Sequence, residues 1–213
     1  MGVRGRTEHV TLAELEAQAA LKDPALAELS DNLVFGEGDD DARVVFVGEA
    51  PGEDEDLSGR PFVGRAGQLL DRILESVGLE RDTVYITNIV KFRPPGNRNP
   101  TPAEVAASEP LLLEQLQLIR PQVIATLGNV PTQYFLPGSG GITKVHGTWH
   151  QWHGLRVLPL FHPAYLLRNA SRERGAPKWL MWQDMKLLTA ALEELPPKQS
   201  KLVIDTAEQG ALF

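Results

Sequence analysis

The stretch 44-VVFVGEAPGEDEDLSGRPFVG-64 decides the fold of this chain. It opens with the apolar run Val44–Val47, which predicts a buried strand, and continues into a loop rich in glycine and carboxylates. Glycine lets backbone N–H groups approach a ligand closely, and open α/β sheets place their sites at the ends of strands. An acidic, solvated strand–helix loop is the plainer interpretation, but it leaves Phe62 unexplained, an aromatic residue in a glycine-rich loop. The stretch therefore predicts a strand end that holds a flat ligand.

Strand and helix periods alternate along the rest of the chain. The apolar runs that predict strands are Val44–Val47, Val84–Thr87, Val123–Leu127 and Val157–Phe161, with a hairpin around Thr148–His153. The helical stripes span Gln68–Val77, Thr101–Arg120, Val130–Phe135 and Lys178–Leu195. This alternation implies a mainly parallel sheet with right-handed crossovers. We expect an α/β domain over residues 34–195, a helical segment over 1–33 that packs on it, and a tail over 196–213.

Size and composition indicate a globular protein. The 213 residues fit one domain with a substantial core, and 42% hydrophobic with 23% charged residues argues against disorder. No apolar run approaches the roughly 20 residues that cross a bilayer, and the first ten residues hold no apolar segment typical of a secretion signal. We therefore expect a cytoplasmic protein with no membrane partner.

Charge and cysteine content narrow the function. The chain has no cysteine, which excludes disulfides, a thiol nucleophile and any cluster held by thiolates. A net charge of −7 argues against a positive field over the whole surface, such as a protein that coats nucleic acid would need. Basic residues nevertheless gather in Lys91–Arg98 and Arg168–Lys178, so a local basic face is still expected.

Polar side chains follow three of the predicted strands. Glu49 lies in GEAPG after the first strand, Asn88 follows the second, and His162 follows the fourth. Taken one at a time, a helix cap, a turn and a packed core histidine would explain them. Because the carboxyl ends of parallel strands meet at one edge of a sheet, the three loops can share a cleft. Their joint placement favours a site.

Three motifs carry a specific resemblance. GEAPGEDEDLSGRPFVGRAGQLLD, ITNIVKFRPPGNRNPTPAE and HPAYLLR, in this order, resemble family 4 uracil-DNA glycosylases, which are base-excision enzymes of bacteria and archaea. The resemblance covers roughly Val34 to Leu188. It implies a three-layer α/β/α fold around a central four-stranded, mainly parallel sheet. It also implies a monomer that acts on uracil-containing DNA, hydrolyses the N-glycosidic bond of a flipped uracil and leaves an abasic site.

The resemblance assigns roles by motif position. Phe62 would stack on the uracil ring, and Asn88 would bond the uracil edge with its amide. His162 would donate to the uracil O2, and Glu49 would position the attacking water. Glu55, near the pocket mouth, is the candidate for excluding the methyl group of thymine. The loop residues Gly48, Ala50, Pro51 and Gly52 complete the expected base-binding pocket.

The chemistry of base excision fits these residue types. Breaking an N-glycosidic bond leaves an oxocarbenium-like sugar and an anionic base, so the site needs donors aimed at the base and negative potential near the sugar. Flipping the base out of the duplex costs a few kcal/mol, which aromatic stacking of about 1–3 kcal/mol per base partly offsets.

A further set of residues is expected to contact the DNA itself. Its basic members would bind phosphates, and one of two leucines would wedge into the vacated stack, although both leucines suit a core equally well. The set comprises Lys91, Arg93, Asn97, Arg98, Tyr165, Leu166, Leu167 and Arg168, and the stretch 170-ASRERGAPK-178 adds further basic residues.

The chain departs from the family in one respect. Family 4 members typically hold an iron–sulfur cluster with four cysteines, and this chain has none. Phe92 and Ser108 stand at two of the ligand positions, and the other pair falls near Ala20 and Asp23. Phenylalanine and serine cannot replace thiolates on iron. We expect no cofactor and no metal, with apolar packing around Phe92 in place of the cluster.

Two other functions are compatible with the sequence. A chain that lost activity together with its cluster would be a non-catalytic module for uracil-containing or abasic DNA. The other alternative is an active enzyme specific for another deaminated base such as hypoxanthine, although the Asn88 amide favours a pyrimidine.

Two weaker motifs complete the pattern. His146, His150 and His153 have a spacing that hints at a metal, but without neighbouring carboxylate or cysteine ligands a hairpin is the simpler interpretation. The last five residues resemble the peptide by which bacterial repair proteins dock on the replication sliding clamp, with Gln209, Leu212 and Phe213 as anchors. An ordinary frayed terminus is the alternative.

Overall fold

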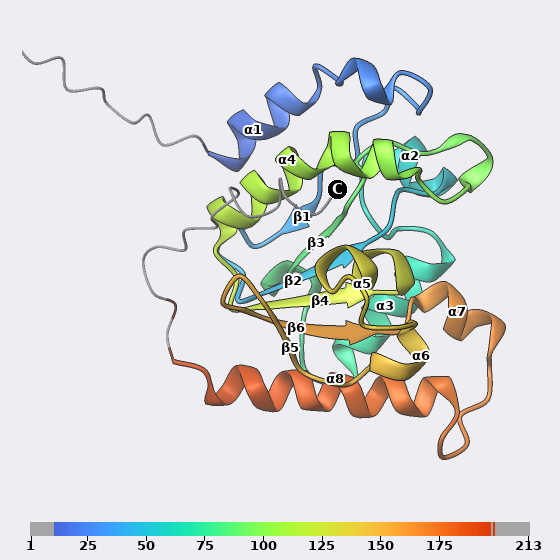
Figure 1. The fold of residues 1–213 in the computed structure, drawn as a ribbon. Coiled ribbons are helices and arrows are strands. Elements are labelled where there is room, and N and C mark those ends of the chain that lie inside the picture. Colours follow the sequence, from blue (N-terminus) through green and yellow to red (C-terminus); the bar gives the residue numbers. More distant parts are fainter. Residues whose placement is uncertain (1–10, 197, 199–213) are drawn as a thin grey trace, which may run out of the picture.

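The computed structural model describes residues 11–196 and Lys198. Within them a six-stranded sheet has the order β1-β3-β2-β4-β6-β5, and helices cover both of its faces (Figure 1). The strands are β1 Glu37–Gly38, β2 Val44–Gly48, β3 Tyr85–Asn88, β4 Val123–Leu127, β5 His150–Trp152 and β6 Leu155–Leu160. The helices are α1 Leu12–Ala19, α2 Glu53–Ser58, α3 Arg65–Glu75, α4 Pro102–Ile119, α5 Asn129–Phe135, α6 Ile142–Val145, α7 Pro163–Arg168 and α8 Pro177–Glu194. Single turns of 3₁₀ helix span η1 Pro24–Leu26, η2 Arg81–Thr83 and η3 Pro95–Asn97.

The central strands confirm the predicted parallel sheet. Strands β3, β2, β4 and β6 are parallel neighbours, and β2 meets β3 with Gly48 opposite Asn88. Two short antiparallel strands, β1 and β5, extend the sheet at its edges. Strand β5 belongs to the expected hairpin, whereas β1 is an addition that the sequence does not predict, because two residues are too few to show an alternating pattern. The three-layer α/β/α fold is confirmed.

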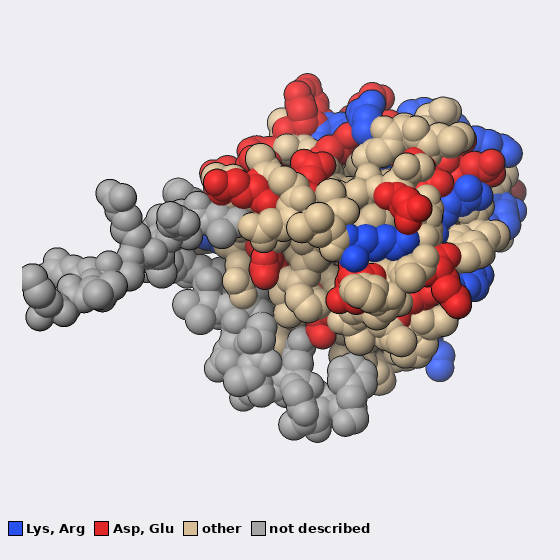
Figure 2. All heavy atoms as spheres, turned by 90° about the horizontal axis from the view of Figure 1, so that it is seen from above, with Lys and Arg blue, Asp and Glu red and all other residues tan. Residues whose placement is uncertain are grey.

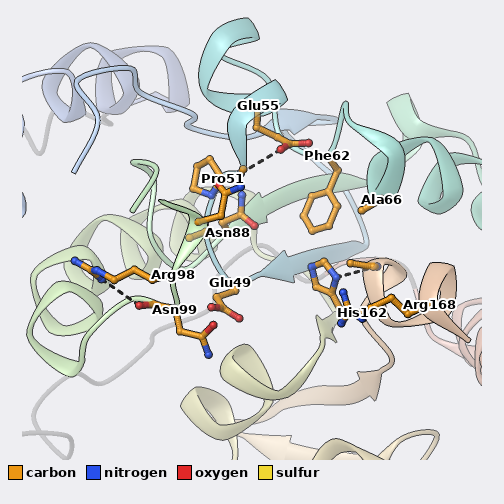
Figure 3. A pocket seen from close by; sticks show the side chains of 14 residues that line it. Glu49, Pro51, Glu55, Phe62, Ala66, Asn88, Arg98, Asn99, His162 and Arg168 are labelled. Carbon is orange, nitrogen blue, oxygen red and sulfur yellow. Dashed lines mark hydrogen bonds between the residues drawn. The ribbon is translucent and has the colours of Figure 1, made fainter. Parts of the chain in front are cut away.

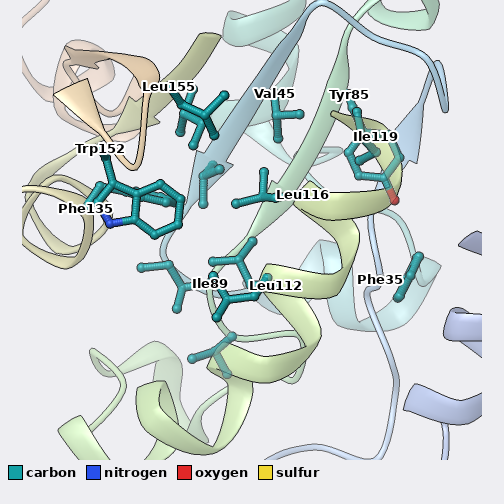
Figure 4. Close-up of a cluster of buried hydrophobic side chains, with 14 of the residues drawn as sticks. Phe35, Val45, Tyr85, Ile89, Leu112, Leu116, Ile119, Phe135, Trp152 and Leu155 are labelled. Carbon is teal, nitrogen blue, oxygen red and sulfur yellow. The ribbon is translucent and has the colours of Figure 1, made fainter. Parts of the chain in front are cut away.

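Alternating side chains of the strands feed two separate cores. Val45 and Val47 of β2 belong to the core under α1, α4 and α5 (Figure 4), whereas Val44 and Phe46 point to the core under α3, α7 and α8. All five residues of β2 are buried, as its continuous apolar run predicts. The sheet is therefore covered on both faces, and its functional groups can lie only at its edges and strand ends.

Helix α4 begins where its sequence signature predicts. Thr101 caps the helix by accepting a 3.2 Å hydrogen bond from the N–H of Glu104, whose carboxylate accepts from the N–H of Thr101 at 2.7 Å. The short helices α2, α6 and α7 are not predicted, because four to six residues cannot display a 3.6-residue period. Two of these, α2 and α7, follow the strand ends that carry the predicted site.

The segment before β1 packs on the outer surface of α4 (Figure 1). Its buried residues include Leu12, Leu15, Leu26 and Leu29, which join the core under α1, α4 and α5. None of the helices within the described residues is long and apolar enough to cross a lipid bilayer.

Candidate active site

A cavity of about 460 Å³ opens at the carboxyl ends of the parallel strands (Figure 3). The loop after β2 contributes Glu49, Ala50, Pro51 and Gly52, and helix α2 contributes Glu55. Phe62 precedes α3, Ala66 lies in its first turn, and β3 contributes Asn88. The remaining lining residues are Asn97, Arg98 and Asn99 before α4, and His162, Ala164 and Arg168 after β6. The three strand-end groups predicted from sequence thus face one cavity.

His162 caps the short helix α7 with its own ring. The main-chain N–H of Ala164 donates to Nδ1 of His162 at 3.1 Å, so Nδ1 is an acceptor and the proton of the neutral ring is on Nε2. Burial, reinforced by the positive charge of Arg168, lowers the pKa of His162 to about 4. At neutral pH the imidazole is therefore uncharged, with one N–H available to a ligand oxygen.

Asn88 presents an unsatisfied group to the cavity. Its side chain is 2% exposed, and its buried Oδ1 has no hydrogen-bond partner among the described residues. Leaving such a group unpaired costs about 1–3 kcal/mol, so the position points to a ligand that donates a hydrogen bond. Gly48 makes room for it, because a Cβ there would lie 2.3 Å from Asn88 Oδ1 and 2.5 Å from Phe62 Cζ.

Phe62 forms the aromatic wall of the cavity. Its ring centroid lies 5.8 Å from that of His162 at an interplanar angle of 36°. The residue has a φ of 51°, the left-handed region that is unfavourable for a bulky side chain and costs of the order of 1–3 kcal/mol. The surrounding structure must hold this backbone in place. Such strain is typical of functional loops.

Two carboxylates of the cavity differ in their surroundings. Glu49 is partly buried, and loss of hydration raises its pKa. Glu55 accepts hydrogen bonds from the N–H groups of Val63 and Gly64, each at 2.9 Å, and from Gly52 at 3.1 Å. Glu55 therefore ties the loop after β2 to the Phe62 loop, a contact that its sequence position does not reveal.

Lys91 lies in the interior, which corrects the expectation that it contacts DNA. Its side chain is 1% exposed, and Nζ donates to Thr87 Oγ1 and to the main-chain oxygen of Asn88, each at 2.6 Å. Complete burial lowers its pKa well below the ordinary value for lysine. A group enclosed in this way does not reach a phosphate, and it supports the backbone of Asn88 instead.

The HPAYLLR segment divides into core and surface residues. Leu166 is 1% exposed and belongs to the core under α3 and α8, so it is not the wedge. Tyr165 stacks on Phe161 with ring centroids 5.4 Å apart. Leu167 is partly exposed and is the remaining wedge candidate of the pair. The helical turn of α7, which the sequence pattern does not show, places the two leucines on different faces.

The predicted phosphate-binding residues differ in their availability. Arg98 forms a two-pronged ion pair with Glu104, at 2.7 and 2.9 Å, and holds the pKa of that carboxyl at about 2. Arg93 donates to Asn97 at 2.7 Å and lies 3.5 Å from Glu53. Arg168 is exposed and forms no ion pair with the described residues. Among the described residues that line the cavity, Arg168 is thus the cation available to a phosphate.

Basic side chains are unevenly distributed on the molecule. Figure 2 shows acidic and basic side chains interspersed on one face, with the basic ones more frequent toward the right of the view. The basic side chains of this face therefore lie among carboxylates, in keeping with the net charge of −7.

The four positions aligned with cluster ligands do not fit an iron–sulfur group. Phe92 is 2% exposed within the α4 core, and Lys22 Nζ lies 5.4 Å from its ring centroid. Ser108 Oγ is buried, and Ala20 and Asp23 are exposed at the surface. Asp23 instead accepts from the N–H of Ala25 at 2.7 Å and caps η1. A single hydroxyl is no substitute for four thiolates.

The histidine-rich segment is structural where it is described. His146 Nδ1 lies 2.7 Å from Asp184 Oδ2, and the His146 ring packs on Phe161 with centroids 4.4 Å apart. His150 is the first residue of β5, and His153 lies in the turn between β5 and β6. Among the described residues no group of three or more histidine, aspartate or glutamate side chains is placed to hold a metal ion.

Three residues that line the cavity could not be predicted from the sequence. Ala66, Asn99 and Ala164 line the cavity, but none carries a residue-type signal. Ala164 acts through its main-chain N–H, which any residue but proline would supply. The position after His162-Pro163 was the available clue, since a histidine before proline at a strand end is suited to capping.

Comparison with known proteins gives a consistent result. The family model described as "Uracil DNA glycosylase superfamily" matches residues 35–186. The chain is 54% identical over 144 residues to a type-4 uracil-DNA glycosylase of Thermotoga maritima, covering 67% of this chain and 75% of the relative. A second type-4 enzyme, from Saccharolobus solfataricus, is 39% identical over 188 residues, covering 84% of this chain and 85% of the relative. A third, from Archaeoglobus fulgidus, is 46% identical over 150 residues, with 67% and 75% covered.

Proposed function

Since this chain belongs to the uracil-DNA glycosylase superfamily, we propose that it hydrolyses the N-glycosidic bond of uracil in DNA and leaves an abasic site. It is a DNA repair enzyme that acts on uracil-containing DNA. The main structural support for this proposal is the buried Oδ1 of Asn88. This oxygen lacks a hydrogen-bond partner among the described residues and borders the cavity that Phe62 and His162 also line.

Base recognition rests on Asn88 and Phe62. In an amide, an acceptor and a donor stand side by side, as do the N3–H and O4 of uracil, so Asn88 pairs with this edge and satisfies its unpaired oxygen. Phe62 stacks on the ring face. Together they offset part of the cost of taking the base out of the helix.

Departure of the base depends on His162. As the bond between C1′ and N1 breaks, its electron pair moves onto the base and negative charge collects on O2. The Nε2–H of the neutral imidazole donates to that oxygen and stabilises the charge. A charged imidazolium is not required, and the low pKa of His162 agrees with this.

Glu49 serves the sugar side of the reaction. Its carboxylate lies in the cavity and supplies the negative potential that an oxocarbenium-like sugar needs. In the ionised form it also accepts a hydrogen bond from the water that adds to C1′. One proton of that water passes to solvent as the abasic sugar forms, and the released uracil anion takes up a proton from solvent, so that the hydrolysis balances.

DNA is held from the α7 side. Arg168 binds a phosphate next to the flipped nucleotide, and Leu167 enters the space that the base vacates. We also propose that the chain acts as a monomer in the cytoplasm and that its last residues dock on the sliding clamp. The clamp-binding peptide, with Gln209, Leu212 and Phe213, lies outside the described residues.

The chain works without an iron–sulfur cluster, in our proposal. The support is the absence of cysteine and the burial of Phe92 beneath Lys22, which also donates to the main-chain oxygen of Leu29 at 2.7 Å. Iron and acid-labile sulfide are measured in the purified protein. We expect neither in stoichiometric amount, and a full complement of both would refute the proposal.

Labelled oligonucleotides test the activity and its specificity. The panel carries uracil opposite guanine, opposite adenine or unpaired, with thymine and hypoxanthine as alternative bases. We expect release from the uracil substrates. Release of hypoxanthine alone would reassign the base, and tight binding without any release would mean a non-catalytic module.

A further inference from the structure

The loop that carries Phe62 is held from two sides by charged side chains. On the N–H side, the Glu55 carboxylate accepts from the main-chain N–H groups of Val63 and Gly64. On the carbonyl side, the Arg81 guanidinium donates through Nη2 to the main-chain oxygen of Pro61 and through Nη1 to that of Phe62 at 3.2 Å. The strained backbone of Phe62 is thus fixed by hydrogen bonds at the peptide groups on both sides of it.

Arg81 is itself fixed in place away from the cavity. It lies in η2, and its side chain is 20% exposed. Nε lies 2.5 Å from Glu37 Oε1, and Nη1 lies 2.8 Å from Asp71 Oδ1. Glu37 is one of the two residues of strand β1, which pairs with β3 at the edge of the sheet. Although burial opposes it, hydrogen bonds from Arg60 and Arg81 keep the pKa of Glu37 below its ordinary value.

The geometry requires a guanidinium group. One side chain reaches two carbonyl oxygens and two carboxylates that lie in different directions, which the planar fork of arginine allows. Lysine has a single nitrogen and would satisfy only part of this set. Gly67 completes the fit, since a Cβ there would lie 1.7 Å from the oxygen of Phe62. The main-chain oxygen of Phe62 is therefore packed closely against the first turn of α3.

We propose that Arg81 is a positioning residue for base binding: with Glu37 and Asp71 behind it, it holds Phe62 in the orientation that stacks on the base. This inference rests on the proposed function. Arg81 is not among the cavity residues, and its influence on uracil passes through Phe62. Nothing in its own sequence neighbourhood, ERDT, marks it as part of the site.

The chain supplies a matched control in Arg60. Arg60 also binds Glu37, at 2.7 Å through Nε and 3.1 Å through Nη2, but its side chain is 61% exposed. Replacing it removes an ion pair with the same carboxylate and leaves the carbonyls of Pro61 and Phe62 bound to Arg81. Arg60→Ala therefore separates the loss of a surface charge from the loss of the loop support.

A double-mutant cycle with Phe62 tests the proposal on the full chain. Arg81→Ala, Phe62→Ala, the double variant and Arg60→Ala are compared for inhibition by free uracil and for single-turnover release from uracil-containing DNA. Thermal unfolding confirms that each is folded, and Arg81→Lys replaces Arg81→Ala in the cycle where the alanine variant does not fold. We expect the Arg81 change to weaken uracil inhibition and slow release by about tenfold in the wild-type background and by less than about twofold without the Phe62 ring. Arg60→Ala stays within about twofold throughout.

Two outcomes of the double-mutant cycle would contradict the proposed role of Arg81. An equal loss from Arg81→Ala with and without the Phe62 ring would mean that Arg81 acts elsewhere, and an unchanged affinity for uracil in the folded Arg81 variant would remove it from the site. Uracil release by the wild-type chain reports separately on the proposed function. Its failure would therefore be distinguishable from a failure of the Arg81 proposal.

Discussion

The main-chain N–H of Ala164 donates a 3.1 Å hydrogen bond to Nδ1 of His162, and this contact fixes which nitrogen of the ring carries the proton. It couples the chemistry to the backbone of α7. It also stabilises the neutral ring, because Nδ1 cannot accept this bond when it is protonated. The proposed mechanism therefore has a direct consequence for pH dependence.

His162 should not titrate between about pH 5 and 8, where an ordinary histidine does. Its folded pKa of about 4 lies below the unfolded value of 6.5, so its contribution to stability is complete above pH 6.5 and is lost as the pH falls through 4. Ring NMR signals, assigned by comparison with His162→Ala, measure this. A titration of His162 near pH 6.5 would contradict the neutral-imidazole mechanism.

Gly48→Ala should abolish base binding without unfolding the protein. Its new Cβ would lie 2.3 Å from Asn88 Oδ1, within the cavity wall, and we expect single-turnover release to fall by about 100-fold or more. Gly141→Ala is the matched control, since the nearest atom to its Cβ is 4.0 Å away. Equal activity of the two variants would show that the Gly48 edge does not border the bound base.

The two adjacent leucines of α7 should respond in opposite ways. Leu166→Ala removes a buried core side chain and is expected to lower the free energy of unfolding by about 2–5 kcal/mol. Leu167→Ala should leave stability nearly unchanged and slow release from duplex DNA more than from single-stranded DNA, because only a duplex has a stack to fill. Denaturant unfolding and paired single-turnover assays measure both effects. A duplex-specific defect in Leu166→Ala alone would reverse the assignment.

Salt dependence should separate Arg168 from Arg98. Replacing a residue that binds phosphate lowers the slope of log binding constant against log salt by about 1. We expect this change for Arg168→Ala and much less for Arg98→Ala, because Glu104 already pairs with Arg98. Binding of uracil-containing DNA is titrated at several salt concentrations. Identical slopes for wild type and Arg168→Ala would exclude the proposed phosphate contact.

Much of the fold was predictable from local patterns. The parallel strands are recognisable in the sequence as apolar runs, and the capping box of Thr101 and Glu104 marks the start of α4. The edge strand β1 and the helices α2, α6 and α7 were not predictable, because each is too short to show a periodic hydrophobic pattern. These short elements depend on tertiary contacts, such as the bonds of Glu55 to the Phe62 loop.

Several residues that line the cavity were predictable from the sequence, but the residues that hold them in place were not. Asn88, His162, Phe62 and Glu49 were recognisable from strand ends and motif, and they do line one cavity. The burial of Lys91 and Leu166 was not, because a basic or apolar residue next to a motif suits either the surface or the core. Arg81 lies 19 residues from the Phe62 oxygen that it binds, so only the folded structure reveals the contact.

The most direct test of the account is single-turnover release of uracil from a duplex, measured for the wild-type chain beside His162→Ala. We expect the wild-type protein to convert the whole substrate to free uracil and an alkali-sensitive abasic site. We expect the His162 variant to be slower by about 100-fold or more. Intact substrate after prolonged incubation with folded wild-type protein, or a near-normal rate in the variant, would contradict it.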